Sequence, residues 1–263
     1  MRCDYHIHTH YLGCGNETMT VDTIVSESVR KGVESIAITD HLNDLKFLEK
    51  HPPIKKDIEA LDAPLDVYFG VELNFLPDGT FPYSEEVAAE TGFQFAIGGP
   101  HGPLIEEYDE KELVRRQHER HLATCEYPLI SILVHPWWFG WGAFEKKGFP
   151  WFNDMSVVPA SVTKELGAAA KETGTAIEIN ACAMFANPRY SFRFKAQYVE
   201  YLALLAEQGP MFSLSTDSHD VAHLGALPMA EAAMREAGIP EDRIWHPSME
   251  PLHGGRAATL RLP

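Results

Sequence analysis

The chain has 263 residues, of which 45% are hydrophobic and 23% charged, and these ordinary globular proportions exclude disorder or low-complexity sequence as a description of the whole chain. Asp and Glu (38) outnumber Lys and Arg (22), and the resulting net charge of −16 disfavours a nucleic-acid partner, because a polyphosphate backbone would be repelled. No apolar run reaches membrane-spanning length and the N-terminus MRCDYHIHTH has no signal-peptide core, so we expect no membrane partner and a cytoplasmic location.

Short apolar runs rich in β-forming residues recur along the chain and predict strands. They cover residues 2–6, 34–39, 66–71, 93–97, 129–134, 175–179 and 211–214. Segments of helical spacing lie between them, at 21–29 behind a cap at Thr20, at 113–125 behind Asp109, and at 162–171, 198–206 and 229–237, with a weaker one at 52–61. Repeated βα units form a parallel sheet, either open or closed into a barrel. No linker or repeat marks a boundary, and we expect a single domain over residues 1–263.

A His, Asp or Glu stands at or just past the end of every predicted strand. In chain order these residues are His6 and His8, Asp40 and His41, Glu72, His101, His135, Glu178, and Asp217 and His219. In a barrel the carboxyl ends of all strands meet at one rim, whereas in an open sheet only neighbours at a switch point meet. A ring of such residues therefore favours a closed barrel.

The residue types in this ring are metal ligands. In an extended strand His6 and His8 lie on one face with roots roughly 6–7 Å apart and can chelate one ion. Glu72 can bridge two ions with its two oxygens. Imidazoles with carboxylates suit zinc, iron or manganese.

Other acidic and imidazole side chains are assigned supporting roles. We expect Asp4 and Asp40 to orient histidines, and Glu178 to do the same while Asn180 faces the pocket. The remaining histidines at 51, 118, 121, 223, 246 and 253 are interpreted as structural or solvent-exposed, whereas the role of His10 is ambiguous.

The segments DYHIHTH, ITDH, GVELN, GPH, LVHP and STDSH, from Asp4 to His219, resemble the motifs of the PHP (polymerase and histidinol phosphatase) superfamily. The resemblance implies a distorted seven-stranded βα barrel, similar to a TIM barrel, with two or three divalent ions (Zn, Mn or Fe). It also implies hydrolysis of phosphate esters.

The resemblance further implies three metal sites. The ligands would be His6, His8, Glu72 and Asp217 in the first; Glu72, His101 and His135 in the second; and His41, His219 and one loop residue in the third. Relatives have His or Asp in that loop, whereas this chain has Cys14 at the corresponding count from His8. A thiolate is a competent zinc ligand, and the alternative is a small residue packed between two glycines.

The implied reaction is attack by water on a phosphate ester. Two ions bridged by Glu72, about 3.5–4 Å apart, would deprotonate that water near neutral pH. Arg189 would clamp the phosphate, since relatives carry a basic residue in this loop, although Arg193 or Lys195 could replace it. Asp217, His219 or a water would protonate the leaving oxygen.

An aromatic-rich segment at 137–152 is the most individual feature of the chain. It is interpreted either as an apolar wall over the leaving group or as a local core or dimer contact. We expect a small phosphorylated substrate with an aromatic or apolar part, such as histidinol phosphate or a nucleotide. The alternatives are a hydrolase of a non-phosphate ester, lactone or amide, an exonuclease-like enzyme, and a non-catalytic metal-binding module.

Overall fold

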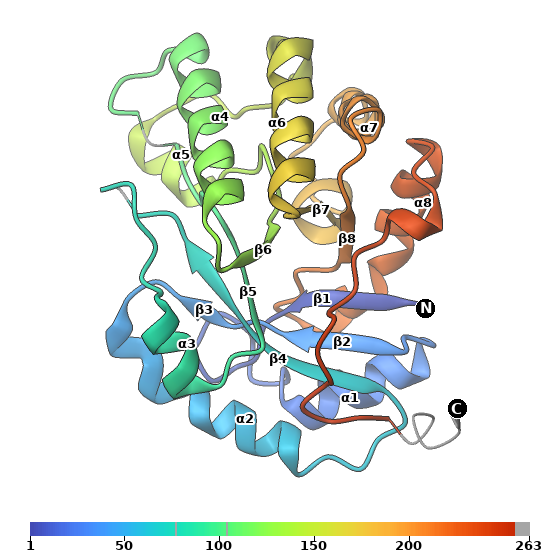
Figure 1. Ribbon diagram of the computed structural model, residues 1–263. Coiled ribbons are helices and arrows are strands. Elements are labelled where there is room, and N and C mark those ends of the chain that lie inside the picture. The colour runs from blue at the N-terminus through green and yellow to red at the C-terminus, as the bar shows by residue number, and fades with distance from the viewer. Residues whose placement is uncertain (77, 104, 256–263) are drawn as a thin grey trace.

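The structure is a computed structural model that describes residues 1–76, 78–103 and 105–255. Its main sheet is parallel and runs in the order β1-β2-β4-β5-β6-β7-β8 (Figure 1). The strands are β1 (Cys3–Ile7), β2 (Ser35–Ile38), β4 (Asp66–Asn74), β5 (Phe95–Gly99), β6 (Ile130–Leu133), β7 (Ala176–Asn180) and β8 (Phe212–Ser215). All seven predicted strands are confirmed. The two-residue strand β3 (His41–Leu42), which pairs with β4, was not predicted because it is too short to show periodicity.

The sheet closes between its first and last strands. Ile7 forms a parallel bridge with Ser218, whose carbonyl also accepts the backbone N–H of His8 at 3.0 Å. The N–H of Asp217 donates to the carbonyl of His6 at 2.8 Å. The predicted distorted seven-stranded barrel is therefore confirmed, and the open sheet is wrong.

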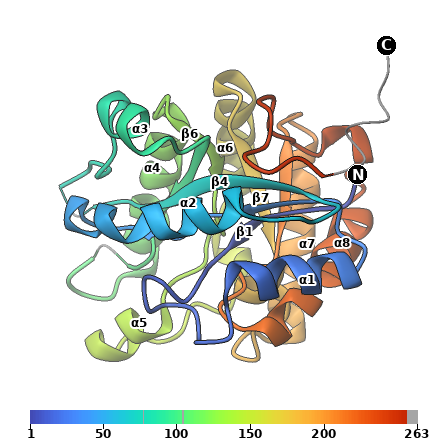
Figure 2. The same cartoon turned by 90° about the horizontal axis from the view of Figure 1, so that it is seen from below.

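Helices cover the outside of the strands (Figures 1 and 2). They are α1 (Val21–Arg30), α2 (His51–Glu59), α3 (Glu85–Thr91), α4 (Glu110–Glu126), α5 (Trp141–Lys147), α6 (Ala160–Thr173), α7 (Phe192–Ala206) and α8 (Leu227–Glu236). The predicted caps are confirmed, because the side chains of Thr20 and Asp109 accept N–H groups of the first turns of α1 and α4. The short helices α3 and α5 were not predicted. Among the described helices, none has the length and apolar character that crossing a bilayer would require.

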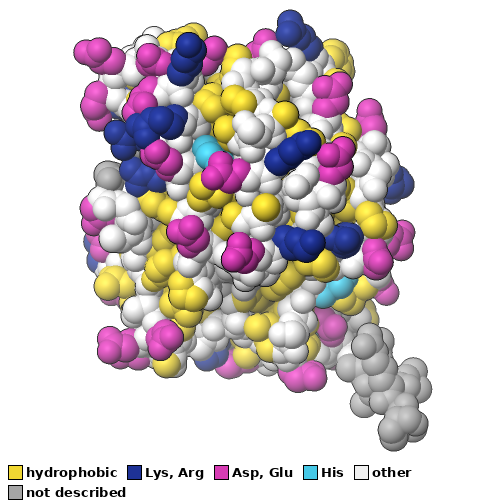
Figure 3. Space-filling model, turned by 45° about the horizontal axis from the view of Figure 1, so that its top comes forward, with side chains coloured by type: hydrophobic (Ala, Val, Ile, Leu, Met, Phe, Trp, Pro, Cys, Tyr) yellow, Lys and Arg dark blue, Asp and Glu magenta, His cyan; other side chains and the backbone are white. Residues whose placement is uncertain are grey.

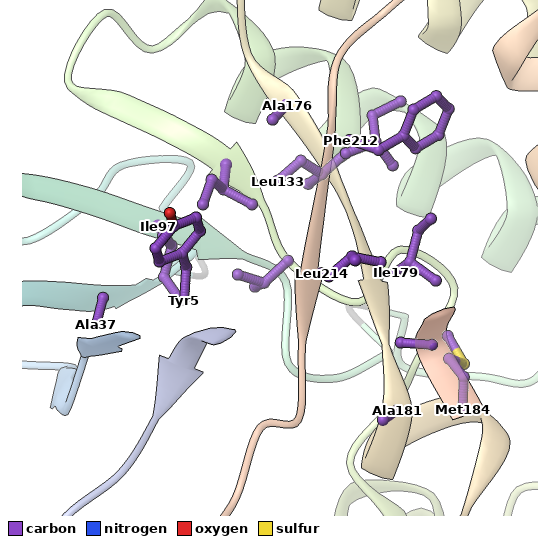
Figure 4. Close-up of a cluster of buried hydrophobic side chains, with 14 of the residues drawn as sticks. Tyr5, Ala37, Ile97, Leu133, Ala176, Ile179, Ala181, Met184, Phe212 and Leu214 are labelled. Carbon is purple, nitrogen blue, oxygen red and sulfur yellow. The ribbon is translucent and has the colours of Figure 1, made fainter. Parts of the chain in front are cut away.

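Apolar side chains from several strands pack together in the core. The ring of Tyr5 lies edge-on to those of Phe95 and Trp245, with centroids 6.5 and 5.7 Å away. Figure 4 shows Tyr5 in one group with residues of other strands, including Ile97, Leu133 and Leu214. The hydroxyl of Tyr5, the polar atom of this ring, bonds to Ser35 at 3.2 Å and to Nδ1 of His246 at 2.9 Å.

The aromatic-rich segment forms a local hydrophobic core against the barrel. Trp137, Phe139 and Phe144 are fully buried, and Phe152 is nearly so. Phe139 contacts both Phe144 and Phe152, with ring centroids 5.1 and 5.4 Å away. The interpretation as a local core therefore holds for these four rings. The interpretation as an apolar wall over the leaving group applies to the less buried aromatic residues of the segment.

Candidate metal centre

Glu72, near the carboxyl end of β4, lies at the centre of a circle of histidine side chains at the mouth of the barrel. Its side chain is 1% exposed. Oε1 lies 2.8 Å from Nε2 of His101 and 3.2 Å from Nε2 of His135. Oε2 lies 2.7 Å from Nδ1 of His41. The two oxygens therefore face donors from different strands, as a bridging carboxylate requires.

A second set of donors meets at the end of β1. Nε2 of His6 and Nε2 of His8 are 2.9 Å apart, which confirms that the His-x-His pair converges. Oδ1 of Asp217 lies 3.3 Å from Nε2 of His8 and 3.6 Å from Nε2 of His6. Oε2 of Glu72 is 3.3 Å from Nε2 of His6, so this set shares the carboxylate of the first.

A third set contains the cysteine of the loop after β1. One donor atom from each of Cys14, His8, His41 and His219 lies within 4.8 Å of the others. Sγ of Cys14 is 3.9 Å from Nδ1 of His8. Cys14 is exposed to solvent as a residue. Desolvation of its sulfur, together with the charge of Asp40, raises the pKa of the thiol to about 12, so without a cation the sulfur stays protonated.

Hydrogen bonds fix which imidazole nitrogen faces the centre. Nδ1 of His101 donates to the carbonyl of Gly99 at 3.0 Å, so its Nε2 presents a lone pair to an oxygen of Glu72. Nδ1 of His6 likewise bonds to Oε1 of Glu178 at 2.7 Å, and its Nε2 points inward. Two acceptors at 2.8 Å repel one another unless a proton or a metal cation lies between them. The donor set therefore fits a metal ion.

The protonation states of these carboxylates and imidazoles also fit a metal ion. Burial works against the charge on Glu72, but the surrounding imidazoles hold the pKa of its carboxyl well below the usual range. The same holds for Asp217, whose pKa is lowered mainly by His6. Burial lowers the pKa of His8 and of His101, and the neutral imidazole is the form that binds metals. Burial also opposes charge on His6, but the carboxylates of Glu72, Asp217 and Glu178 outweigh it and raise the pKa of this imidazole. A metal ion bound here would therefore compete with a proton for the imidazole nitrogen.

Backbone strain is concentrated at the mouth. In the described part of the chain the non-glycine residues with positive φ are His135 (28°), Trp137 (67°) and Asp217 (55°). Each such conformation costs on the order of 1–3 kcal/mol and persists only where the surrounding structure compels it. Two of the three are candidate ligands that follow β6 and β8, which indicates that the chain turns sharply there to aim them at the centre.

The family model of the PHP domain matches residues 4–181. The chain belongs to the PHP domain family. The DNA polymerase/3'-5' exonuclease PolX of Bacillus subtilis is 26% identical over 242 residues, which cover 89% of this chain but only 37% of that protein. A probable phosphatase of Thermoanaerobacter sp. is 24% identical over 245 residues, covering 90% of this chain and 87% of that protein.

Solved structures share the fold. The histidinol phosphate phosphatase of Lactococcus lactis, complexed with zinc, L-histidinol and phosphate, has a TM-score of 0.63 at 16% identity, covering 91% of this chain and 94% of its own. The putative histidinol phosphatase of Listeria monocytogenes has a TM-score of 0.59 at 14% identity, covering 85% and 97%. At these identities the likeness shows that the fold is shared.

Glu178 connects more of this PHP site than its sequence position suggested. Besides His6, its carboxylate accepts the backbone N–H of His135 at 2.5 Å, the amide of Asn180 at 3.0 Å and the hydroxyl of Ser215. Asn180 also donates to Asp217 at 3.2 Å, so it braces the centre instead of facing an open pocket. Asn74 was missed, although it stands two residues after Glu72 on β4 and its amide oxygen lies 3.1 Å from Nδ1 of His101.

The two buried aspartates bond mainly to threonine residues beside the ligands. Asp4 accepts the backbone N–H and hydroxyl of Thr216 at 2.9 and 2.6 Å. Asp40 accepts the same two groups of Thr9, at 3.1 and 3.0 Å. Burial raises the pKa of Asp4 to about 7 and that of Asp40 to about 6. They therefore hold the backbone beside the ligands, and Asp4 also accepts the backbone N–H of His6 at 3.4 Å, so their support of the histidines acts through the main chain.

Most other histidines contact groups outside the centre. Their partners are the carbonyl of Phe47 for His51, Glu165 for His118, Gln117 for His121, the hydroxyl of Tyr5 for His246 and the carbonyl of Ala63 for His253. His10 bonds to the carbonyl of Met19, which resolves its ambiguous role as a loop contact. Arg189 is exposed, and its guanidinium lies 4.4 Å from the ring centroid of Trp141.

We expect Glu178→Gln to lower kcat about 10- to 100-fold without removing the ions, because loss of the carboxylate frees the His6 ring that it orients. Metal content per chain and steady-state kinetics of the variant check this. An unchanged kcat at full metal content would show that Glu178 does not position His6.

Proposed function

We propose that this PHP-family protein is a metal-dependent phosphoesterase that hydrolyses a small organic phosphate monoester, such as histidinol phosphate or a nucleotide. The observation that carries the proposal is the buried carboxylate of Glu72, which faces imidazoles on both of its oxygens at a barrel mouth. Relatives named probable phosphatases support it. So does the neighbour that holds zinc, L-histidinol and phosphate.

Two or three ions, of zinc, manganese or iron, would be held by the residues predicted from the sequence. We assign His6, His8, Glu72 and Asp217 to the first site, Glu72, His101 and His135 to the second, and His41 and His219, with one residue of the loop after β1, to the third. When bound, such ions deprotonate water and neutralise phosphate oxygens, which explains how a chain of net charge −16 can act on an anion.

The protein's own groups set the direction of proton transfer. Asp217 is ionised because neighbouring imidazoles hold its pKa down, so it is unsuited to donate a proton. That leaves the protonation of the leaving oxygen to His219 where the third site holds no ion, or otherwise to water entering beside its side chain, which is 34% exposed. Glu178 and Asn180 keep the ligands in place during turnover.

Trp138 supplies the apolar surface for the leaving group. Its ring centroid lies 4.8 Å from that of His135 and 6.0 Å from that of His101, so it stands at the edge of the centre. Trp141 is 38% exposed, with the guanidinium of Arg189 4.4 Å from its ring centroid. This arrangement supports a substrate with an aromatic or apolar part.

We expect Arg189→Ala to raise KM for phosphorylated substrates roughly three- to tenfold with little change in kcat, because the clamp contributes a charge-assisted hydrogen bond to bound phosphate. Arg193→Ala is the matched variant, since Arg193 is exposed and paired with Asp154 at 3.3 Å. If only Arg193→Ala raised KM, the result would show that Arg193, and not Arg189, binds the phosphate.

A hydrolase of a non-phosphate ester, lactone or amide is the second candidate. It is favoured by the placement of Arg189 over Trp141, where the guanidinium contacts a ring instead of the centre. An exonuclease-like activity is less favoured. The net charge of −16 opposes binding of a polyphosphate strand. On the one face seen in Figure 3 the Lys and Arg side chains lie in separate groups with acidic side chains nearby.

A substrate panel separates these functions. Purified protein with zinc or manganese is assayed for release of phosphate from histidinol phosphate, nucleotides and other monoesters, beside diesters, an oligonucleotide, lactones and carboxylic esters. We expect the highest kcat/KM for a monoester with an aromatic part. Turnover of a lactone or ester without phosphate release from any monoester would overturn the proposal.

A further inference from the structure

The loop after β1 is built to bring a thiol to the centre. Gly15 packs so closely under the end of β1 that a Cβ there would lie 2.6 Å from the carbonyl oxygen of Thr9. This close approach places the neighbouring Cys14 with its sulfur 3.9 Å from Nδ1 of His8. The sulfur also belongs to one donor group with His41 and His219.

His8 provides an independent reason to expect a ligated sulfur. The side chain is fully buried, and its Nε2 faces Asp217 and the Nε2 of His6. A neutral imidazole has one lone pair, so when Nε2 is the ligand atom Nδ1 carries the proton. That buried N–H points at the sulfur of Cys14, and a thiolate accepts such a bond more strongly than a thiol does.

We propose that Cys14 is a thiolate ligand of the third cation site, with His41 and His219, and that this donor set makes the site select zinc over manganese. The inference rests on the proposed metal centre. Thiolate is a soft donor that favours zinc, whereas manganese favours carboxylate and water. His8 links the two sites, because its Nε2 serves the first while its N–H supports the sulfur of the third.

Cobalt(II) is the probe, because a thiolate bound to it gives an intense near-ultraviolet charge-transfer band that imidazole and carboxylate do not give. Metal-free protein is titrated with cobalt while absorbance and cobalt bound per chain are recorded. We expect the band in the wild-type chain. We expect Cys14→Ser to lose it and keep the weaker visible bands of the other sites. Cys182→Ser, the matched control, should keep it, since Cys182 contacts the carbonyl of His223 and is outside the three donor groups.

Selectivity is measured by equilibrium dialysis against zinc and manganese. We expect Cys14→Asp to bind the full number of ions while its preference for zinc over manganese falls at least about tenfold. Cobalt binding without a charge-transfer band, or an unchanged preference for zinc over manganese in Cys14→Asp, would overturn the role of Cys14. Either result would still be consistent with the proposed metal centre. Failure of the wild-type chain to bind cobalt, zinc or manganese would overturn both.

Discussion

Replacing Glu72 by glutamine is expected to abolish turnover, with kcat falling about 1000-fold or more. The carboxylate contacts five imidazoles, and an amide is a much weaker ligand that cannot hold two cations together. Stabilisation of transition-state charge by metal ions is worth several kcal/mol, and each 1.4 kcal/mol is about tenfold in rate. Phosphate release and metal content of the purified variant measure the effect.

The matched control is Glu165→Gln, which makes the same chemical change to a carboxylate 63% exposed on α6 and paired with His118. We expect it to retain wild-type kinetics and metal content. His8→Ala should resemble Glu72→Gln, and far-ultraviolet circular dichroism should show both variants folded. Full activity in Glu72→Gln and His8→Ala would contradict the proposed ligand roles.

The regular elements of this fold were predictable because they depend on local chemistry. The apolar run of β4 and the side-chain caps at Thr20 and Asp109 can be recognised within a few residues of sequence. Closure was predictable less directly, from a His, Asp or Glu after every strand, since those ends meet only in a barrel. The hydrogen bonds from Asp217 to His6 and from His8 to Ser218 show how the chain achieves it.

The residue types of the site were predictable from the sequence, but the hydrogen bonds that hold those residues in place were not. Periodicity cannot show that Glu178 joins His6 to the backbone of His135, because those residues are far apart in sequence. Nor can it distinguish an aspartate that orients an imidazole from one that, like Asp4, holds the backbone of Thr216. Both depend on distances across the barrel, which follow from packing and register and not from local pattern.

The aromatic-rich segment illustrates the same limit. Trp137 and Trp138 are adjacent in sequence, yet Trp137 is fully buried and Trp138 stands beside His101 and His135. The positive φ of Trp137 contributes to this separation, because it sends the two rings in different directions. Composition alone assigns both rings to one role, and only the backbone conformation divides them.

Removal of the ions with a chelator is expected to abolish activity and to lower the thermal midpoint by roughly 10 °C for each ion lost. A ligand present at about 1000 times its Kd stabilises the folded state by about 4 kcal/mol, and a chain of this size shifts by about 2–4 °C per kcal/mol. Differential scanning calorimetry before and after chelation measures the shift, and zinc or manganese should restore both properties.

Glu72→Gln separates loss of metal from a direct effect of the chelator on the protein. Because this variant is expected to hold fewer ions, its thermal midpoint should fall less on chelation than that of the wild-type chain, and added zinc should recover less of it. An equal fall in both proteins would mean that the chelator acts elsewhere. If the wild-type chain were instead insensitive to chelation and retained its full activity, no cation would be needed for the reaction, and the convergence of imidazoles on Glu72 would require a different explanation.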